Sequence, residues 1–295
     1  MMKDYHIGSL DEEGKAALLS GEDQSEDSSE ELRTFLQPGK WRKAVLHSKR
    51  NVSWDTRLFT FKLDHEEQTL GLPVGQHLMI RLRDPATREA IIRSYTPISE
   101  TDKAGFMDVL VKVYFDSKQR SGGKMSQALD GIPIGHFVDF KGPIGRFTYH
   151  GQGSCTVNSE ERKVDKYVMV SGGSGITPIY QVLRTVMQDE FDATRCVVLD
   201  GNRLLEDILC KDDLDGFARG NEEKCQLLYT LTQAPDDWDG LRGRIAAPLL
   251  KEHCSRATHE GSNVLMLICG PEALEKSVHE ALLADGWTDD DMVFF

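Results

Sequence analysis

Two patterns of hydrophobic and polar positions divide this chain of 295 residues. From Trp41 to Tyr149, apolar residues recur about every second position in short runs rich in β-branched and aromatic residues, which is typical of β-strands. The predicted strands are 41–47, 57–63, 77–82, 91–98, 107–115, 137–140 and 147–149, with one short helix beginning near 123–126. Turn sequences rich in glycine, proline and aspartate separate them. Many short strands at this spacing predict a small antiparallel barrel.

The second half of the chain alternates buried strands with helices. The predicted strands are 166–170, 195–199, 226–232 and 264–268, and the predicted helices are 178–187 and 272–284, with a glycine turn at 171–175. Such alternation predicts a parallel sheet that is covered by helices on both faces, which is a common nucleotide-binding architecture.

These patterns predict five segments. They are a tail over 1–10, an acidic linker over 11–37, a barrel domain over 38–150, an interdomain linker over 151–165 and an α/β domain over 166–295. The linker assignment depends on charge, because residues 1–36 hold ten Asp or Glu against three Lys or Arg, and 21–30 hold no apolar residue.

Charge and cysteine content exclude several classes of protein. A net charge of −13 disfavours nucleic acid as a partner. No window approaches the roughly 20 apolar residues of a membrane-spanning helix, and the start of the chain resembles no signal peptide. The six cysteines are scattered without a C-x-x-C pair, so we expect no metal site. A cytoplasmic protein fits these features best.

One candidate site is Arg93-Ser94-Tyr95-Thr96-Pro97, on a predicted barrel strand. A dinucleotide with a flat ring system needs a cation for its pyrophosphate, an aromatic surface for the ring, and a hydroxyl near the ring nitrogen that takes hydride. Alternate positions share one face of a strand, so we expect one strand to present Arg93, Tyr95 and Thr96 together. An ordinary edge strand with exposed polar groups is the alternative.

A second candidate is Gly122-Gly123-Lys124-Met125-Ser126. Glycines ahead of a short helix expose N–H groups that suit a phosphate. The same sequence is also typical of a glycine-capped helix start that binds nothing. Because both candidates fall within one predicted barrel, they could hold opposite sides of one pyrophosphate.

Two further candidates lie in the α/β half. The turn from Gly172 to Pro178 follows a buried strand and opens a helix, as a phosphate-binding turn does, but it does not match G-x-G-x-x-G, and Thr177 before Pro178 is also an ordinary helix start. Cys269-Gly270-Pro271 ends another core strand, where ligands of α/β sheets bind. A thiol there could pack against a nicotinamide ring, or it could be a buried cysteine in a turn.

Together these motifs resemble the cytochrome b5 reductase family, within the ferredoxin–NADP reductase superfamily, over about residues 38–295. The resemblance rests on 93–97, 111–115, 122–126, 141–143, 172–178 and 269–271. Residues 4–10 are similar to the tail of the haem domain in assimilatory nitrate reductases, particularly the fungal type. The resemblance therefore implies the C-terminal FAD/NAD(P)H module of such an enzyme, with an antiparallel Greek-key FAD-binding barrel followed by a parallel-sheet α/β NAD(P)-binding domain.

The resemblance also implies roles for individual residues. Arg93 would bind the FAD pyrophosphate, Tyr95 would lie against the flavin and ribityl chain, and Thr96 would hydrogen-bond near flavin N5. Thr96, Lys112 and Cys269 would be the catalytic residues. The other implied cofactor contacts are Val111, Tyr114, Gly123, Lys124, Met125, Ser126, Gly172, Gly173, Thr177, Arg203, Gly270 and Pro271. Hydride would pass from NADPH or NADH to FAD, and single electrons would pass on to a cytochrome b5-type haem domain in the same polypeptide or a separate one.

The sequence departs from the family pattern at three places. Trp54 stands where members commonly have histidine, Glu272-Ala273 replaces two prolines after Pro271, and Leu204-Leu205 replaces Thr-Glu after Arg203. The last change leaves the coenzyme open, because Arg203 could pair with a 2′-phosphate although NADH-using relatives also carry arginine there. A freestanding NADH-cytochrome b5 reductase and a catalytically silent nucleotide-binding module are the alternative readings.

Overall fold

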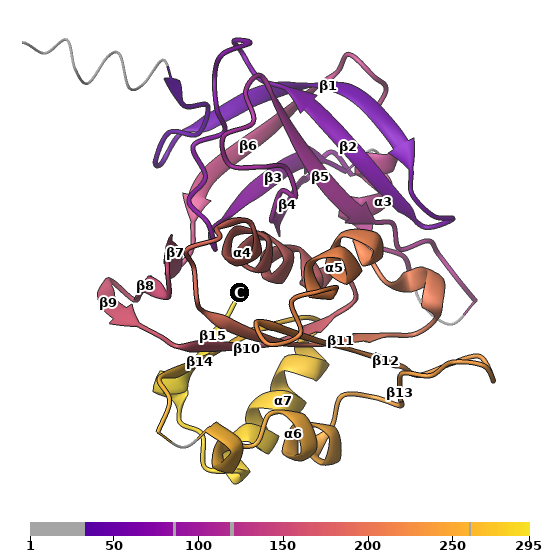
Figure 1. Cartoon of the computed structure of the whole chain (residues 1–295). Coiled ribbons are helices and arrows are strands. Elements are labelled where there is room, and N and C mark those ends of the chain that lie inside the picture. Colours follow the sequence, from indigo (N-terminus) through magenta and orange to yellow (C-terminus); the bar gives the residue numbers. More distant parts are fainter. Residues whose placement is uncertain (1–32, 85–86, 119–120, 260) are drawn as a thin grey trace, which may run out of the picture.

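The computed structural model describes residues 33–84, 87–118, 121–259 and 261–295. An antiparallel sheet lies above a parallel sheet with helices on both of its faces (Figure 1). The predicted fold class is therefore confirmed. The expected tail and most of the acidic linker lie outside the described residues. Within those residues, no helix has both the length and the apolar character needed to cross a lipid bilayer.

The first sheet has six antiparallel strands in the order β4-β3-β6-β1-β2-β5. They are β1 (Trp41–Asn51), β2 (Thr56–Lys62), β3 (His77–Arg83), β4 (Ala90–Tyr95), β5 (Phe106–Lys112) and β6 (Phe137–Ile144). Helix α3 (Lys124–Asp130) packs against β3 and β4. Alternation along β2 buries Phe59 and Phe61 completely in the barrel core, as the period of two predicts.

The barrel core also takes in residues from the segment read as linker. Phe35 and Leu36 are 0% and 3% exposed, and the Phe35 backbone N–H donates to the Thr69 carbonyl at 2.8 Å. The boundary predicted after residue 37 is therefore too late. Two apolar residues beside a long acidic run carry too little periodicity to be recognised from the sequence.

The parallel sheet has the order β13-β12-β11-β10-β14-β15. Its strands are β10 (Lys166–Gly172), β11 (Arg195–Asn202), β12 (Cys225–Leu231), β13 (Leu241–Arg242), β14 (Val264–Cys269) and β15 (Met292–Phe294). Helices α4 (Ile176–Gln188) and α5 (Lys211–Ala218) lie between this sheet and the barrel, while α6 (Ala247–His253) and α7 (Glu272–Ala284) cover the opposite face (Figure 1). Short 3-10 helices are η1 (Gly173–Gly175), η2 (Leu205–Asp207), η3 (Arg256–His259) and η4 (Asp289–Asp291).

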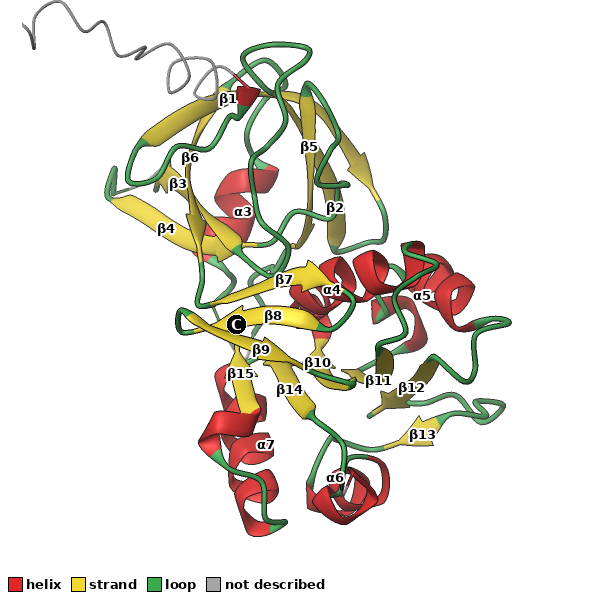
Figure 2. Ribbon diagram, turned by 60° about the vertical axis from the view of Figure 1, so that its left-hand side comes forward, coloured by secondary structure: helices red, strands yellow, loops and turns green. Residues whose placement is uncertain are grey.

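A small sheet of three antiparallel strands joins the two domains (Figure 2). Its strands are β7 (Phe147–Gly151), β8 (Ser154–Val157) and β9 (Glu160–Lys163). Most of the segment read as an interdomain linker over 151–165 is thus a hairpin. The buried positions on β8 are Cys155 and Val157, and their polar neighbours hide the alternation.

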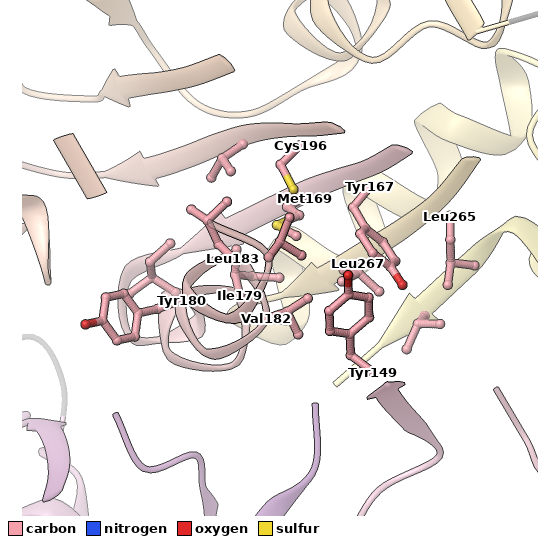
Figure 3. Packing of buried hydrophobic residues seen from close by; sticks show 14 of the residues in the cluster. Tyr149, Tyr167, Met169, Ile179, Tyr180, Val182, Leu183, Cys196, Leu265 and Leu267 are labelled. Carbon is pink, nitrogen blue, oxygen red and sulfur yellow. The ribbon is translucent and has the colours of Figure 1, made fainter. Parts of the chain in front are cut away.

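The two domains share a core. Helix α4 is buried along most of its length because the parallel sheet covers one side of it and the barrel the other. Its side chains Ile179, Val182 and Leu183 pack beside Tyr149 and Tyr167 (Figure 3). Arg184 donates to the Ile98 and Ser99 carbonyls of the barrel domain at 2.6 Å each. This packing fixes the position of the α/β domain relative to the barrel.

Candidate functional site

A cleft of about 820 Å³ opens between the two domains. One wall comes from the β1–β2 loop and the end of β5, and the other from the carboxyl ends of parallel strands, where such sheets bind ligands. The barrel wall consists of Trp54, Asp55, Lys112, Val113, Tyr114, Phe115, Asp116 and Ser117. The α/β wall consists of Gly172, Gly173, Gly201, Asn202, Arg203, Asp207, Thr232, Gly243, Arg244, Ile245, Pro271, Ala273, Leu274 and Ser277.

The glycine turn after β10 forms the centre of the α/β wall. Gly173 has φ +56°, which favours glycine, and nothing lies within 4 Å of the position that a Cβ would take. A Cβ on Gly175 would lie 2.2 Å from the Cys269 carbonyl oxygen, so this residue packs backbone to backbone against the end of β14. The contact of Gly175 with the end of β14 therefore fixes the position of the turn. The space beside Gly173 is open, so a ligand can approach the backbone there.

Lys112 ties the two walls together. Its Nζ lies 3.0 Å from the Asp55 carboxylate in the barrel and 2.5 Å from the Asp207 carboxylate in η2. Burial alone would lower the pKa of Lys112, but the hydrogen bonds to Asp207 and Asp55 outweigh it and raise the pKa. Lys112 is therefore a fixed cation at the junction, with two carboxylates already neutralising it.

An aromatic pair stands at the barrel side of the cleft. The Trp54 and Phe115 ring centroids are 6.2 Å apart, and the two side chains are 61% and 39% exposed. The Arg57 guanidinium lies 6.0 Å from the Phe115 ring centroid. Trp54 was noted from the sequence only as a departure from the family pattern, and in the structure it lines the cleft.

A second group of predicted residues gathers on the barrel around β4 and α3. Arg93 is exposed, and its guanidinium donates to the neighbouring Ile92 carbonyl at 2.7 Å. Burial raises the pKa of Tyr95 to about 12, with Tyr114 adding to the effect and Arg93 opposing it. Ser126 Oγ accepts from the Tyr114 N–H and donates to the Gly123 carbonyl, both at 3.1 Å. Tyr114 therefore connects this group to the cleft.

The single-strand arrangement expected for the first motif is wrong in one respect. Strand β4 ends at Tyr95, and Thr96 lies beyond it at 7% exposure, while Arg93 is exposed. The reason is the period of two: Arg93 and Tyr95 share a face, but Thr96 is three positions from Arg93 and precedes Pro97, which cannot continue the hydrogen-bond ladder.

Three other predicted contacts differ in what they can offer a ligand. The side chains of Val111 and Met125 belong to the barrel core at 2% and 4% exposure, so only their backbone groups remain available. Lys124 is 71% exposed and lies 3.8 Å from the Asp84 carboxylate.

Thr177 and Cys269 lie outside the lining of the cleft. Thr177 Oγ1 donates to the Ser174 carbonyl at 3.2 Å within the turn. Burial, with a contribution from Glu275, raises the pKa of Cys269 to about 12. The thiol is therefore neutral near pH 7, which favours a packing contact over a role as a thiolate. The neighbouring Gly270 N–H donates to the Glu275 carboxylate at 3.1 Å.

The structure thus divides the predicted residues into two sets. Those that line the cleft are Lys112, Tyr114, Gly172, Gly173, Arg203 and Pro271. Those outside its lining are Arg93, Tyr95, Thr96, Val111, Gly123, Lys124, Met125, Ser126, Thr177, Cys269 and Gly270.

Sequence reasoning missed eight polar residues of the cleft, which are Asp55, Asp116, Ser117, Asn202, Asp207, Thr232, Arg244 and Ser277. Asn202 and Asp207 follow β11, and its carboxyl end was a usable signal, although only Arg203 was taken from it. Arg244 follows the two-residue strand β13, which has no periodicity to detect. Asp55 belongs to the turn before β2, where it lines the cleft and forms an ion pair with Lys112.

These residues fit two nucleotides. Strand β4, which carries the exposed Arg93, contacts α3, so one side of the barrel offers the first N–H groups of α3 and a guanidinium that has no carboxylate partner among the described residues, as a pyrophosphate requires. The glycine turn and the two arginines, Arg203 and Arg244, supply the same chemistry on the α/β wall.

Comparison with known proteins agrees with this division. Residues 43–149 match the family model of an oxidoreductase FAD-binding domain, and residues 169–280 match that of an oxidoreductase NAD-binding domain. The predicted cofactors, FAD and NADPH or NADH, are confirmed at this level.

The chain is similar over its full length to curated fungal proteins. It is 59% identical over 297 residues to the nitrate reductase [NADPH] of Leptosphaeria maculans and 54% identical over 295 residues to that of Aspergillus niger. It spans 33% of the length of each of them.

A solved structure covers the same module. The crystal structure of the cytochrome b5 reductase domain of Ulva prolifera nitrate reductase superposes with a TM-score of 0.82 at 31% identity. The match covers 89% of this chain and 100% of that one.

Proposed function

This chain belongs to the family of cytochrome b5 reductase domains of nitrate reductases, and we propose that it carries electrons from NADPH through FAD to a cytochrome b-type haem on the way to nitrate. Its FAD-binding and NAD-binding domains make it an NAD(P)H-dependent flavoprotein oxidoreductase. The observation that carries the proposal is the cleft itself, because a glycine turn and two arginines face the end of a barrel strand across it.

Bound FAD supplies the redox chemistry, since it accepts a hydride and releases electrons one at a time. The protein's residues have the tasks of binding and orientation. Arg93 and the first turn of α3 would hold the FAD pyrophosphate, with Tyr95 against the flavin and ribityl chain and Thr96 near flavin N5. Gly172 and Gly173 would let the pyridine nucleotide approach the β10 turn closely, and Cys269, whose carbonyl packs against Gly175, would lie against the nicotinamide. Lys112 would keep the two walls at a fixed separation.

Two arginines support NADPH as the donor. Arg203 and Arg244 line the cleft beyond the ends of β11 and β13, and Arg203 is only loosely tied to Asp207 at 3.6 Å. A guanidinium that is free to reorient can make charge-assisted hydrogen bonds to a 2′-phosphate. The relatives named as NADPH enzymes are consistent with this choice.

The electron acceptor is proposed to be a cytochrome b5-type haem domain of the same polypeptide. The support is that the curated nitrate reductases are about three times as long as this chain, which leaves room for other domains. Six free cysteines suit a reducing compartment, so the proposed reaction belongs in the cytoplasm.

The test compares NADPH with NADH as reductants of ferricyanide and of a purified cytochrome b5-type haem domain, using FAD-loaded protein. We expect both acceptors to be reduced, with kcat/KM at least about tenfold higher for NADPH, which is the size of one charge-assisted contact. Arg244→Gln should lower kcat/KM for NADPH and leave that for NADH unchanged. Protein that stays colourless after incubation with FAD, or that binds FAD without reducing ferricyanide, contradicts the proposal.

A further inference from the structure

Three polar side chains lie buried at the carboxyl ends of β10 and β11. Ser171 and Asp200 occupy paired positions on the two strands, and both are fully buried. Ser171 Oγ and Asn202 Nδ2 each donate to the Asp200 carboxylate at 2.6 Å. We call Ser171, Asp200 and Asn202 the Asp200 network. It forms part of the floor of the cleft, because Asn202 lines the cleft beside Gly201.

Among the residues that the structure describes, Asp200 has no positively charged partner. Its two hydrogen bonds come from neutral donors, and within the described ranges no lysine, arginine or histidine forms an ion pair with it. Burial raises the pKa of Asp200 to about 6, although the bonds from Ser171 and Asn202 lower it. The group is thus ionised at neutral pH at a cost in free energy, and an apolar or neutral side chain would avoid that cost.

The carboxylate determines which way the Asn202 amide faces. An ionised carboxylate only accepts hydrogen bonds, so the amide nitrogen of Asn202 must face Asp200 and its oxygen must face away. That oxygen, Oδ1, is buried and has no hydrogen-bond partner among the described residues. Asn202 itself is 7% exposed. Asn202 lines the cleft, so a small rotation of its side chain would present this oriented, unpaired acceptor to a bound ligand.

The donor follows from the chemistry of a pyridine nucleotide. Phosphate groups only accept, which leaves the ribose hydroxyls, the nicotinamide carboxamide and the adenine amino group. Strand β11 lies between β10, whose glycine turn faces the centre of the cleft, and β12, beyond which Thr232 lines it. A group above β11 thus belongs to the middle of an extended dinucleotide, between its two ring systems.

From this placement we propose that Asn202 Oδ1 accepts a hydrogen bond from a ribose hydroxyl of the bound pyridine nucleotide, and that Asp200 is the positioning residue that holds the amide in this orientation. The inference rests on the proposed function, since it assigns a contact within the same cleft. Nucleotide binding satisfies the unmet acceptor, so part of the binding energy comes from a group that is unpaired before the ligand arrives.

The first experiment measures NADP+ binding to the oxidised, FAD-loaded protein from the change in flavin absorbance. Asn202→Leu keeps the approximate volume and removes the acceptor. We expect its Kd for NADP+ to rise roughly threefold to tenfold, with kcat at saturating NADPH changed less than about twofold. Wild-type protein that fails to bind NADP+ would defeat the proposed function, whereas an unchanged Kd in folded, FAD-loaded Asn202→Leu would overturn the Asn202 assignment alone.

The positioning role of Asp200 needs its own pair of variants. Asp200→Leu leaves the Asn202 amide free to rotate and should raise the Kd for NADP+ about as much as Asn202→Leu does. Asp200→Asn still accepts from the Asn202 amide nitrogen and should recover most of the affinity. Asp192→Asn is the matched control, because Asp192 is equally buried but holds Tyr149 and the Gln152 and Thr194 backbone away from the cleft. Wild-type affinity in Asp200→Leu would overturn the positioning role.

Nucleotide analogues identify the donor. The 3-acetylpyridine analogue of NADP+ lacks the carboxamide N–H, and the hypoxanthine analogue lacks the adenine amino group, while both keep their ribose hydroxyls. If a ribose hydroxyl is the donor, Asn202→Leu should weaken all three ligands by the same factor. A variant that weakens NADP+ but leaves either analogue unaffected would assign the contact to the group that this analogue lacks and overturn the ribose assignment.

Discussion

The two walls of the cleft meet a ligand by different means. The barrel wall presents side chains, with Trp54, Tyr114 and Phe115 as rings and Lys112 as a charge. The α/β wall presents backbone at its centre, because glycines occupy the ends of β10 and β11. Ligand binding by the barrel wall depends on individual side chains. Ligand binding at the centre of the α/β wall depends instead on how the strand ends pack, which no single side chain determines. We therefore expect single substitutions in the barrel to have the larger effects.

Lys112→Met is the strongest test of the barrel wall. It leaves the Asp55 and Asp207 carboxylates, at 4% and 5% side-chain exposure, without their shared cation. Removing one partner of a buried ion pair should lower the free energy of unfolding by about 3 kcal/mol, measured by urea denaturation.

The matched control for Lys112 is Lys103→Met. Lys103 lies 2.5 Å from the Asp108 carboxylate, the same distance as Lys112 from Asp207, but its side chain is 37% exposed. We expect the loss there to stay below about 1 kcal/mol. Equal losses at the two lysines would mean that burial at the domain junction does not set the strength of the Lys112 interaction.

Arg93→Glu tests the contribution of a barrel side chain to FAD affinity rather than to the stability of the fold. The residue is exposed and bonds only the Ile92 carbonyl among the described residues, so the fold should not depend on it. We expect FAD to bind about a hundredfold more weakly, because a charge-assisted pair becomes a repulsion, while the melting temperature of the FAD-free protein stays the same.

Arg83→Glu provides the comparison for Arg93. This residue is exposed at the end of the neighbouring strand and likewise donates to a backbone carbonyl, that of Arg88, at 3.1 Å. Equilibrium dialysis should show FAD retention close to that of the unmodified protein. Similar losses of FAD in both variants, or a fall in the melting temperature with Arg93→Glu, would argue against a specific pyrophosphate contact.

The helices and strands could be predicted wherever apolar residues recur at one constant spacing along the element. Helix α7 occupies the predicted residues 272–284, and the barrel strands fall close to their predicted ranges. Periodicity failed where polar residues interrupt a short strand, as in β8, or where an element is too short to repeat, as in β13. Phe35 and Leu36 were not predicted as core residues for a related reason. Their burial depends on contact with Thr69, which is far from them in the sequence.

The site was less predictable than the fold. Motifs identified the glycine turn and Lys112, because each carries a local signature. The partners of Lys112 come from a barrel loop and from η2, and only the packing of the two domains brings them together. Asp200 follows the predicted strand 195–199 directly, where a polar residue indicates the end of a strand, yet it is completely buried. Tertiary packing decides such positions.

Asp200→Asn is the first test of the α/β wall, and its effect depends on pH. The pKa of Asp200 is raised from 3.8 to about 6 by burial, so the folded state favours the protonated form. The favourable contribution of Asp200 to the free energy of unfolding is fully present below 3.8, the pKa of the group in the unfolded chain. It declines by about 3 kcal/mol at most as the pH rises to about 6. The asparagine variant avoids this decline.

The readout is the difference in melting temperature between Asp200→Asn and the unmodified protein from pH 4 to 8. We expect the variant to gain relative stability between pH 4 and 6 and to keep a constant advantage above pH 6. A difference that shrinks with rising pH would mean that Asp200 is stabilised as a carboxylate, which would remove the argument that the group is kept at a cost.

Cys269→Ala should have the smallest effect and is the sharpest test of a backbone wall. The thiol has a pKa of about 12, so it is neutral throughout the working range, and the Cys269 carbonyl rather than its sulfur packs against Gly175. We expect kcat/KM for NADPH to fall by no more than about fivefold, with an unchanged pH profile between pH 7 and 9. If instead the profile of the unmodified enzyme has a limb in that range that the alanine variant lacks, the thiolate takes part in the reaction. The centre of the α/β wall, at the glycine turn, would then act through a side chain as well as through its backbone.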